Sequence, residues 1–473
     1  MRFASFVQEK YETISSIRDF MKGGAAPKFP ANLFFEVSNL CDLKCAMCGP
    51  FSALNDMRLF SLKEEERGFM KAPEESKLAD VLKHALRIQV FGYGEPTLNP
   101  DFKDFLDIAG KYEALISFFS NGMHFSDEIV EKIIDNNVHE ITISFSGTTK
   151  EEYESVYIGG VWETVLDGLK RINKRKQESG SRYPIISVNS LAYRHHVENL
   201  DRFVDVMADA GANVIYLKPL VPVPTVPALG QHASIFRHWV DGEVLSRAAT
   251  KAIAAGILLS TDLYTSVGAR DEADYQRRQN RFYINSGLDP DNLPPVTPIT
   301  ELRDLAKNTK LKKPSKGVDE IPLEDDGDVS ASELNAGGMY CLEPFNTMYI
   351  GRNLAVKPCC NAPSTTKFDS VRTKSALQVW DGDAYRAART AILNDKYPSY
   401  CRECVRTGNA YAEHDFVGTI ASYGTWYTSV FQSDFNCVPL PKIISLGSNA
   451  DVAVRHRGSL KKVFNRILAA TGG

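Results

Sequence analysis

The sequence predicts an α/β fold, in which a six-stranded parallel sheet with covering helices is followed by a small cysteine-rich region. Three observations support this prediction. Strand and helix patterns alternate between residues 32 and 218, as a parallel β/α architecture requires. Several of the strand patterns run directly into glycine-rich or polar turns. The cysteines gather mainly in two groups, one after the first strand and one beyond residue 340.

The composition is that of an ordinary globular protein. The chain has 473 residues, enough for two or three domains, of which 43% are hydrophobic and 24% are charged. Its net charge of −4 gives no bulk attraction to nucleic acid, so we expect no nucleic-acid partner. We find neither a membrane-spanning stretch nor a signal peptide. We therefore expect a cytoplasmic protein whose nine cysteines serve as metal ligands and not as disulfides.

The order of the predicted elements places the polar turns at one edge of the sheet. The six strands cover residues 32–37, 88–91, 115–119, 141–145, 185–188 and 214–217. Apolar residues between them recur at helical spacing, as at Leu78, Val81, Leu82 and Ala85. In parallel α/β folds ligands bind at the carboxyl ends of the strands, so the site is expected there.

The first strand leads into three cysteines, Cys41, Cys45 and Cys48, with the spacing C-x3-C-x2-C. One tight loop with this spacing can point three sulfurs at a common centre. Cysteine thiolates are the usual ligands of iron–sulfur clusters, and three of them leave one iron of a [4Fe–4S] cluster open to a small molecule. The alternative is a zinc site that takes its fourth ligand from elsewhere in the chain.

A second motif, Gly92-Tyr93-Gly94-Glu95-Pro96, follows the second strand. Together with the cysteine triplet it resembles the radical S-adenosylmethionine (SAM) family, although Tyr93 separates two glycines that are adjacent in that family. The resemblance implies a partial (β/α)6 barrel over residues 31–220. It also implies that the open iron binds SAM, and that SAM cleavage yields a 5′-deoxyadenosyl radical that abstracts hydrogen from a substrate.

The same resemblance implies a set of cofactor-binding residues at the strand ends. Glu95 is expected to hold the amino group of SAM, and Arg194 either pairs with its carboxylate or makes a surface salt bridge. Ser120, Asn121 and Asn189 are candidate contacts, with strand-end capping as the alternative. Tyr93 faces the barrel mouth and is expected to contact substrate. The full set of predicted cofactor contacts is Gly92, Gly94, Glu95, Ser120, Asn121, Ser144, Asn189 and Arg194.

The second group of cysteines has the pattern of a closed cluster site. Cys341 and Cys359 stand at the two bases of a predicted β-hairpin, and Cys401 and Cys404 form a C-x2-C turn. Four thiols would ligate an auxiliary [4Fe–4S] cluster completely, with a structural zinc site as the alternative. The region resembles the SPASM and twitch domains. With only Cys437 beyond Cys404, it is closer to the single-cluster twitch type, as in radical SAM dehydrogenases of aminocyclitol biosynthesis.

Cys360 directly follows a predicted ligand. Neighbouring residues on a strand point to opposite faces, so Cys359 and Cys360 are not expected to serve one cluster. Two interpretations of Cys360 stay open. It is either a small buried apolar residue, or a catalytic donor of a hydrogen atom to a substrate radical, which would make the enzyme an epimerase.

The remaining parts of the chain are divided by composition. We expect an N-terminal helix and linker over 1–30, an insertion over 221–337 that is a linker or a lid, and a twitch-like domain over 338–440. The tail, 441–473, is basic and partly apolar. It is expected to form an ordinary helix, with association to a membrane surface as the alternative.

These observations lead to a predicted activity. We expect a radical SAM dehydrogenase that oxidises a small polar metabolite such as a sugar or aminocyclitol, with flavodoxin or ferredoxin as reductant. The short segment before the first strand leaves no room for a leader-binding module, which counts against a peptide substrate. The alternatives are a peptide maturase or epimerase and, outside enzymes, a structural zinc protein.

Overall fold

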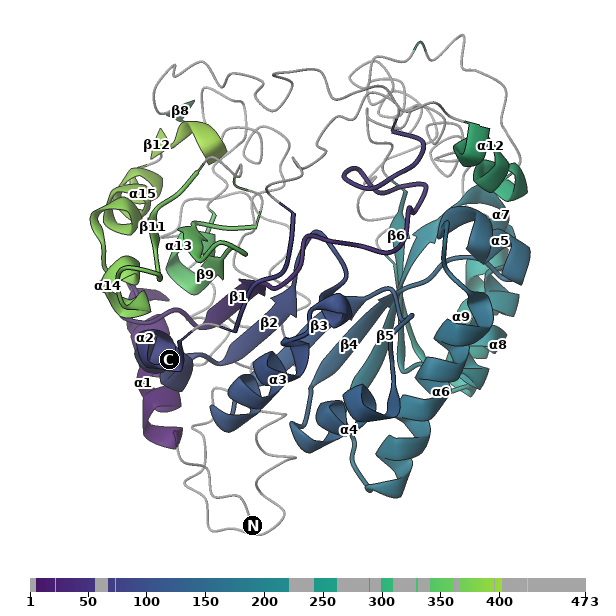
Figure 1. Cartoon of the computed structure of the whole chain (residues 1–473), viewed down its shortest axis with the longest axis horizontal. Helices are drawn as coiled ribbons and strands as arrows, with labels where there is room; N and C mark the ends of the chain where they lie inside the picture. The colour runs from purple at the N-terminus through teal and green to yellow at the C-terminus, as the bar shows by residue number, and fades with distance from the viewer. Residues whose placement is uncertain are drawn as a thin grey trace.

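The computed structural model describes residues 6–21, 23–55, 67–72, 74–220, 242–261, 289, 299–308, 329–330, 341–360, 362, 366–394, 396–401 and 423. These residues contain one large sheet with the strand order β11-β10-β9-β1-β2-β3-β4-β5-β6-β7. The sheet is open, with helices packed along its outer side (Figure 1). This arrangement confirms the predicted α/β class with a partial barrel.

The six predicted strands are all present and parallel to their neighbours. Their bounds are β1 Asn32–Glu36, β2 Arg87–Phe91, β3 Leu115–Ser120, β4 Glu140–Ser144, β5 Ile185–Ala192 and β6 Val214–Pro219. In β2 the alternate residues Ile88 and Val90 are buried in the core, and the residues beside them are only partly buried. This period of two arises because successive side chains on a strand point to opposite faces.

Helices cover that apolar face. They are α2 Glu75–His84, α3 Phe102–Lys111, α4 Asp127–Asp135, α5 Lys150–Val156, α6 Trp162–Glu178, α7 Arg194–Glu198 and α8 Leu200–Asp209. The predicted apolar faces are the buried ones, as Leu78, Val81 and Leu82 of α2 show. None of the described helices is long and apolar enough to cross a lipid bilayer.

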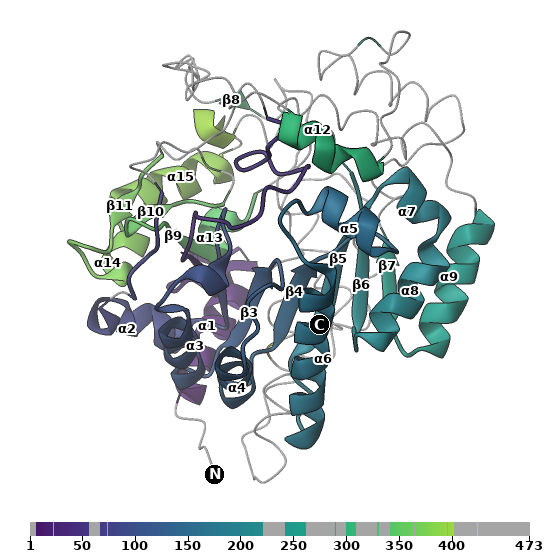
Figure 2. The same cartoon turned by 45° about the vertical axis from the view of Figure 1, so that its right-hand side comes forward.

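The first described part of the predicted insertion is another α/β unit. Helix α9 (Gly242–Ala254) leads to β7 (Leu258–Thr261), which pairs in parallel with β6. The sequence pattern missed β7 because the strand is only four residues long. Further along, η5 (Ile299–Glu301) and α12 (Leu302–Asn308) lie beside α5 (Figure 2), where Arg303 contacts Glu154 at 3.2 Å. Most of the remaining insertion and the whole tail lie outside the described residues, so their predicted roles stay predictions.

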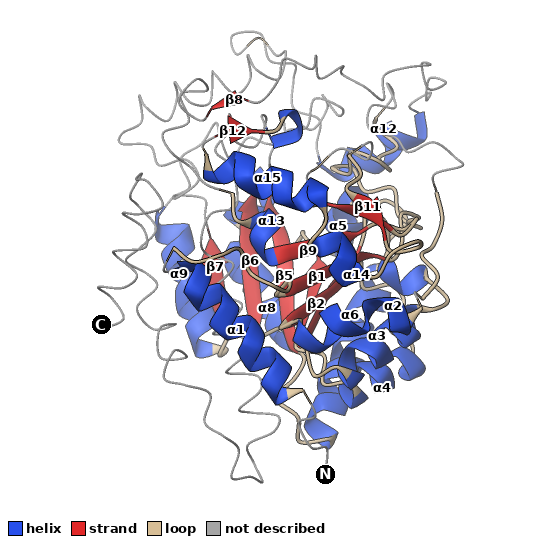
Figure 3. Ribbon diagram, turned by 90° about the vertical axis from the view of Figure 1, so that its left-hand side faces the viewer, coloured by secondary structure: helices blue, strands red, loops and turns tan. Residues whose placement is uncertain are grey.

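The cysteine-rich region shares the barrel's sheet. After α13 (Glu343–Asn346), strand β9 (Thr347–Ile350) pairs in parallel with β1, and β10 (Ala355–Lys357) pairs antiparallel with β9. The predicted hairpin therefore exists and extends the barrel edge. Strand β11 (Asp369–Ser370) completes that edge, and α14 (Ala376–Trp380) and α15 (Asp383–Leu393) pack around it (Figure 3). A separate two-stranded sheet joins β8 (Val329–Ser330) to β12 (Lys396–Tyr397), just before η6 (Ser399–Cys401).

The N-terminal helix α1 (Val7–Met21) is anchored to α2 by a buried lysine. The Lys10 ammonium donates to the carbonyl oxygens of Leu82 and Ala85, at 3.4 and 2.5 Å. These carbonyls belong to the last turn of α2, which has no helical partners for them. Lys10 therefore caps the C-terminus of α2 and joins α1 to the barrel.

This lysine predicts how stability depends on pH. Burial lowers the pKa of Lys10 from 10.5 to about 7, although Glu113 and Glu9 act in the opposite direction. Between about pH 7 and 10 the unfolded chain holds a proton that the folded chain lacks, so folding becomes more favourable as pH rises. Lys10→Met should flatten this dependence when urea unfolding is measured at pH 7 and pH 9.5. Lys174→Met, on an exposed face of α6, should leave it unchanged; an equally steep dependence in Lys10→Met would contradict the assignment.

Candidate active site

The loop after β1 carries the first three thiols and is held in place by its own backbone hydrogen bonds and buried side chains. The Lys44 amide donates to the Ile158 carbonyl and the Ala46 amide to the Val156 carbonyl, both at 2.8 Å. The side chains of Leu43 and Ala46 are buried in the core. The residues between the cysteines therefore fix the loop to the end of α5, and the thiols themselves remain half-buried.

The three thiols influence one another electrostatically. Burial raises the pKa of Cys45, and the neighbouring Cys48 and Cys41 raise it further. Burial likewise raises the pKa of Cys41 to about 12. Among the described residues, no three potential ligands meet at the spacing of a single metal ion. A [4Fe–4S] cluster does not require that, because each thiolate binds a different iron, and a cluster would supply the positive charge that favours thiolates.

The Gly-Tyr-Gly-Glu turn packs directly against this loop. The Gly94 amide donates to the Ser38 carbonyl at 3.1 Å, and the Glu95 amide donates to the Leu40 carbonyl at 2.8 Å. A Cβ atom at Gly92 would lie 2.0 Å from the Ser38 oxygen, and one at Gly94 would lie 2.0 Å from the Leu40 oxygen. Tyr93, in contrast, is 51% exposed. The close approach therefore requires glycine at both flanking positions and tolerates the inserted tyrosine.

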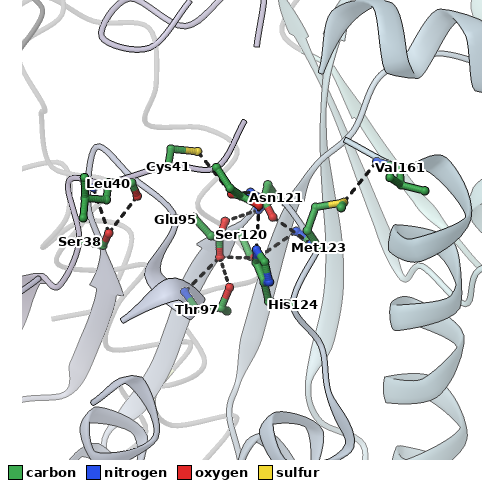
Figure 4. A network of polar contacts seen from close by, with 12 residues as sticks. Ser38, Leu40, Cys41, Glu95, Thr97, Ser120, Asn121, Met123, His124 and Val161 are labelled. Atoms are coloured by element: carbon green, nitrogen blue, oxygen red, sulfur yellow. Dashed lines mark hydrogen bonds and ion pairs between the residues drawn. The ribbon is translucent and has the colours of Figure 1, made fainter. Parts of the chain in front are cut away.

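Glu95 connects the ends of β2 and β3. Its Oε1 accepts from the Thr97 amide, the Thr97 hydroxyl and the Ser120 hydroxyl at 3.1, 2.6 and 2.8 Å. Its Oε2 accepts from the Asn121 amide at 2.6 Å (Figure 4). Burial raises the pKa of Glu95, and these hydrogen bonds oppose that rise. The Glu95 carboxylate thus binds two other predicted site residues, Ser120 and Asn121. Its contact with SAM stays a prediction.

Two site residues that the sequence analysis missed extend this network. Asp42 lies inside the cysteine loop. Its Oδ1 accepts from the side-chain nitrogen Nδ2 of Asn121, and its Oδ2 pairs with His124 Nε2, both at 2.8 Å. Burial acts to raise the pKa of Asp42, but His124 and Asn121 hold it below its usual value. The hydrogen bond to Asp42 raises the pKa of His124. The cysteine loop is therefore tied to the ends of both β2 and β3. Asp42 fills a spacer position between two cysteines, so the motif alone could not single it out.

The other predicted cofactor contacts lie further along the sheet. Ser144 at the end of β4 pairs with Asn189 on β5, one and two strands beyond Ser120. The side chain of Arg194 lies outside the described residues. All of these positions stay predictions as SAM contacts.

Three thiols of the second group lie in the described residues, at Cys341, Cys359 and Cys401. Burial raises the pKa of Cys341, and the charges of Glu343, Cys401 and Cys359 raise it further. Cys404 lies outside the described residues. Cys360 is half-buried, and burial raises its pKa to about 12. Both interpretations of Cys360 stay open, as does the choice of Cys359 as ligand.

Glu95 predicts a measurable effect on SAM binding. Glu95→Ala removes a charged acceptor, and loss of a charge-assisted contact should weaken SAM binding by roughly 10- to 100-fold. Equilibrium dialysis with anaerobically reconstituted protein measures this. Glu75→Ala is the matched control, because Glu75 binds Lys111 and Tyr112 on the surface. SAM affinity unchanged in Glu95→Ala would limit Glu95 to a structural role.

Comparisons with known proteins follow the same division of the chain. Residues 35–210 match the radical SAM superfamily, and residues 341–405 match the SPASM iron–sulfur cluster-binding domain. The mycofactocin maturase MftC of Mycolicibacterium smegmatis is 24% identical over 189 residues, which are 39% of this chain and 43% of that protein. A Pyrococcus furiosus protein, the cofactor-modifying protein of a tungsten-containing aldehyde ferredoxin oxidoreductase, is 22% identical over 198 residues, covering 40% of this chain and 52% of that one.

The curated matches span about half of those relatives' length or less. Among solved structures, Streptococcus suis SuiB bound to its precursor peptide SuiA aligns over 86% of this chain and 77% of that one, with 15% identity and a TM-score of 0.46.

These findings correct two predictions. A small polar metabolite as substrate, and the dehydrogenase of aminocyclitol type derived from it, are contradicted by the match to the mycofactocin maturase MftC. The small-molecule partner is wrong for the same reason. The error has a physical source, since cysteine spacing specifies how a cluster is held and carries no information about what lies beside it.

Proposed function

Because the chain belongs to the radical SAM superfamily and carries a SPASM iron–sulfur domain, we propose that it is a peptide maturase. The observation that carries this proposal is the match of 189 residues, 39% of this chain, to the mycofactocin maturase MftC. The shared sheet supports it, since β9 of the cysteine-rich region pairs with β1, the strand that leads to the first three thiols. A peptide lying across that edge could reach both thiol groups.

The cofactors follow from the two domains, which take SAM, a [4Fe–4S] cluster and auxiliary iron–sulfur clusters. When bound, the first cluster and SAM supply a 5′-deoxyadenosyl radical that removes hydrogen from the substrate. Cys41, Cys45 and Cys48 would hold that cluster. Ser120, Asn121 and Glu95 would shape the SAM site, and the burial of Glu95 is consistent with a site that excludes water.

We further propose that the modification is an oxidation. Cys341, Cys359, Cys401 and Cys404 would hold one auxiliary cluster beside the barrel, in a position to take an electron from the modified residue. The domain limits 31–220 and 338–440 are part of this proposal, as is reduction by flavodoxin or ferredoxin. The joined hairpin supports it, because Cys341 and Cys359 flank strands β9 and β10, and β9 pairs with β1, the strand that leads to the cysteine loop.

The proposal is tested by comparing two classes of substrate. Reconstituted enzyme with SAM and dithionite receives, in separate arms, synthetic peptides encoded by short reading frames beside this gene, or monosaccharides and aminocyclitols. We expect a peptide to raise 5′-deoxyadenosine formation and to lose hydrogen, as measured by mass spectrometry. A response to small molecules alone would overturn the proposal.

A further inference from the structure

Three buried side chains meet where the hairpin joins the barrel, at a place here called the seam: Glu36, Tyr349 and Lys357. They are 8%, 2% and 6% exposed. Glu36 ends β1, Tyr349 of β9 pairs with Phe34 of β1, and Lys357 of β10 pairs with Tyr349. Three neighbouring strands of the sheet therefore contribute one buried polar or charged side chain each to the seam.

The three side chains of the seam interact with one another. Glu36 Oε2 accepts from the Arg352 amide at 3.3 Å. Burial raises the pKa of Tyr349, and the nearby Glu36 carboxylate raises it further. The Lys357 ammonium lies 4.4 Å from the centre of the Tyr349 ring and donates to the Ala362 carbonyl at 3.2 Å. Burial raises the pKa of Glu36 and lowers the pKa of Lys357, and the attraction between the two groups opposes both shifts. The charged form of each group is therefore stabilised by the other.

The seam lies between the two groups of thiols. Glu36 precedes the cysteine loop, in which the Ser38 and Leu40 carbonyls bind the Gly-Glu turn. Lys357 directly precedes Pro358 and Cys359. Burial raises the pKa of Tyr93, and the nearby groups Glu36, Cys360 and Cys359 raise it further. A displacement of the hairpin along β1 would therefore change the separation of the two thiol groups and the surroundings of Tyr93.

We propose that Glu36, Tyr349 and Lys357 are positioning residues that hold the auxiliary thiols at one distance from the cysteine loop, and so couple hydrogen abstraction to oxidation of the peptide. This rests on the proposed function. An auxiliary cluster held by those thiols would accept one electron from the peptide radical, and water would accept the proton that leaves with it. Electron transfer depends on the separation that the seam sets. Removing one charge leaves the other buried and uncompensated, which favours displacement of the hairpin.

The test uses reconstituted holoenzyme with Glu36→Gln and Lys357→Met. We expect iron content and SAM-dependent 5′-deoxyadenosine formation to stay near wild type. The ratio of oxidised peptide to 5′-deoxyadenosine should fall roughly tenfold or more, as for other small misplacements. The double variant should recover part of this loss because neither charge remains. Electron paramagnetic resonance of the dithionite-reduced protein should show an altered magnetic interaction between the two clusters in the single variants.

Lys176→Met is the matched control, because Lys176 is another buried lysine that donates to a carbonyl, that of Pro184. An equal fall in coupling in this control, or iron loss in proportion to product loss, would overturn the proposal. Tyr349→Phe keeps the ring packed in the seam and replaces the charge variants in this test if they do not fold. An unchanged ratio of oxidised peptide to 5′-deoxyadenosine and an unchanged magnetic resonance spectrum in Tyr349→Phe would also overturn the proposal. If wild type modifies no peptide, the proposed function fails, and the magnetic interaction alone decides the role of the seam.

Discussion

Replacing Cys41, Cys45 and Cys48 together by alanine should abolish 5′-deoxyadenosine formation and remove about half of the bound iron. Anaerobic reconstitution of the wild-type chain should give close to eight irons, because each of two clusters holds about four. The backbone contacts of Lys44 and Ala46 with α5 do not involve the thiols, so the loop should keep its place in the variant. Iron and sulfide analysis, with chromatography of 5′-deoxyadenosine, measures both effects.

Cys360→Ser is the control for this experiment. Because Cys360 is not assigned as a ligand, this variant should keep both clusters and SAM cleavage. If Cys360→Ser loses the auxiliary cluster while Cys359→Ser retains it, the ligand assignment is reversed. If instead clusters and radical formation persist while product formation stops, Cys360 is a hydrogen donor and the oxidation proposal fails. A triple variant with full iron content, or a wild-type protein that holds only zinc, would contradict the cluster assignment.

Gly94→Ala should reduce SAM cleavage by more than about 100-fold while leaving the auxiliary cluster bound. The new Cβ would lie 2.0 Å from the Leu40 oxygen and 2.5 Å from the Leu40 nitrogen, so the turn and the cysteine loop would have to separate. Both neighbours are backbone atoms and cannot rotate away. That separation would also break the hydrogen bond from the Glu95 amide to the Leu40 carbonyl.

The matched control is Gly49→Ala, in the segment that directly follows the cysteine triplet. A Cβ atom at Gly49 would meet nothing within 4 Å. This variant should therefore cleave SAM at nearly the wild-type rate. Comparable losses in both variants would show that the close contact with Leu40 is not the cause.

The sequence predicts the barrel well because each of its strands carries its own local signal. The alternating burial in β2 and the helical spacing of Leu78, Val81 and Leu82 are local properties. The pairing of β9 with β1 joins residues more than 300 positions apart. No local pattern encodes such a partnership, so the hairpin was foreseen but its place at the barrel edge was not.

The same distinction applies to the site. Cys41 and Gly94 belong to motifs whose spacing has a physical meaning, so they could be identified in advance. Asp42, His124, Glu36 and Lys357 are common charged residues whose roles arise only from the side chains beside them. The substrate class was mispredicted for a related reason, because cluster ligands are readable from spacing and the shape of a substrate site is not.

The most direct test of a peptide maturase follows the abstracted hydrogen atom. Reconstituted enzyme is given SAM, dithionite and a candidate peptide deuterated at carbon, and the 5′-deoxyadenosine formed is analysed by mass spectrometry. A peptide maturase should transfer deuterium from the peptide to 5′-deoxyadenosine. The triple cysteine variant should show no such transfer. Transfer from deuterated sugars or aminocyclitols, with none from any peptide tested, would contradict the proposal of a peptide maturase.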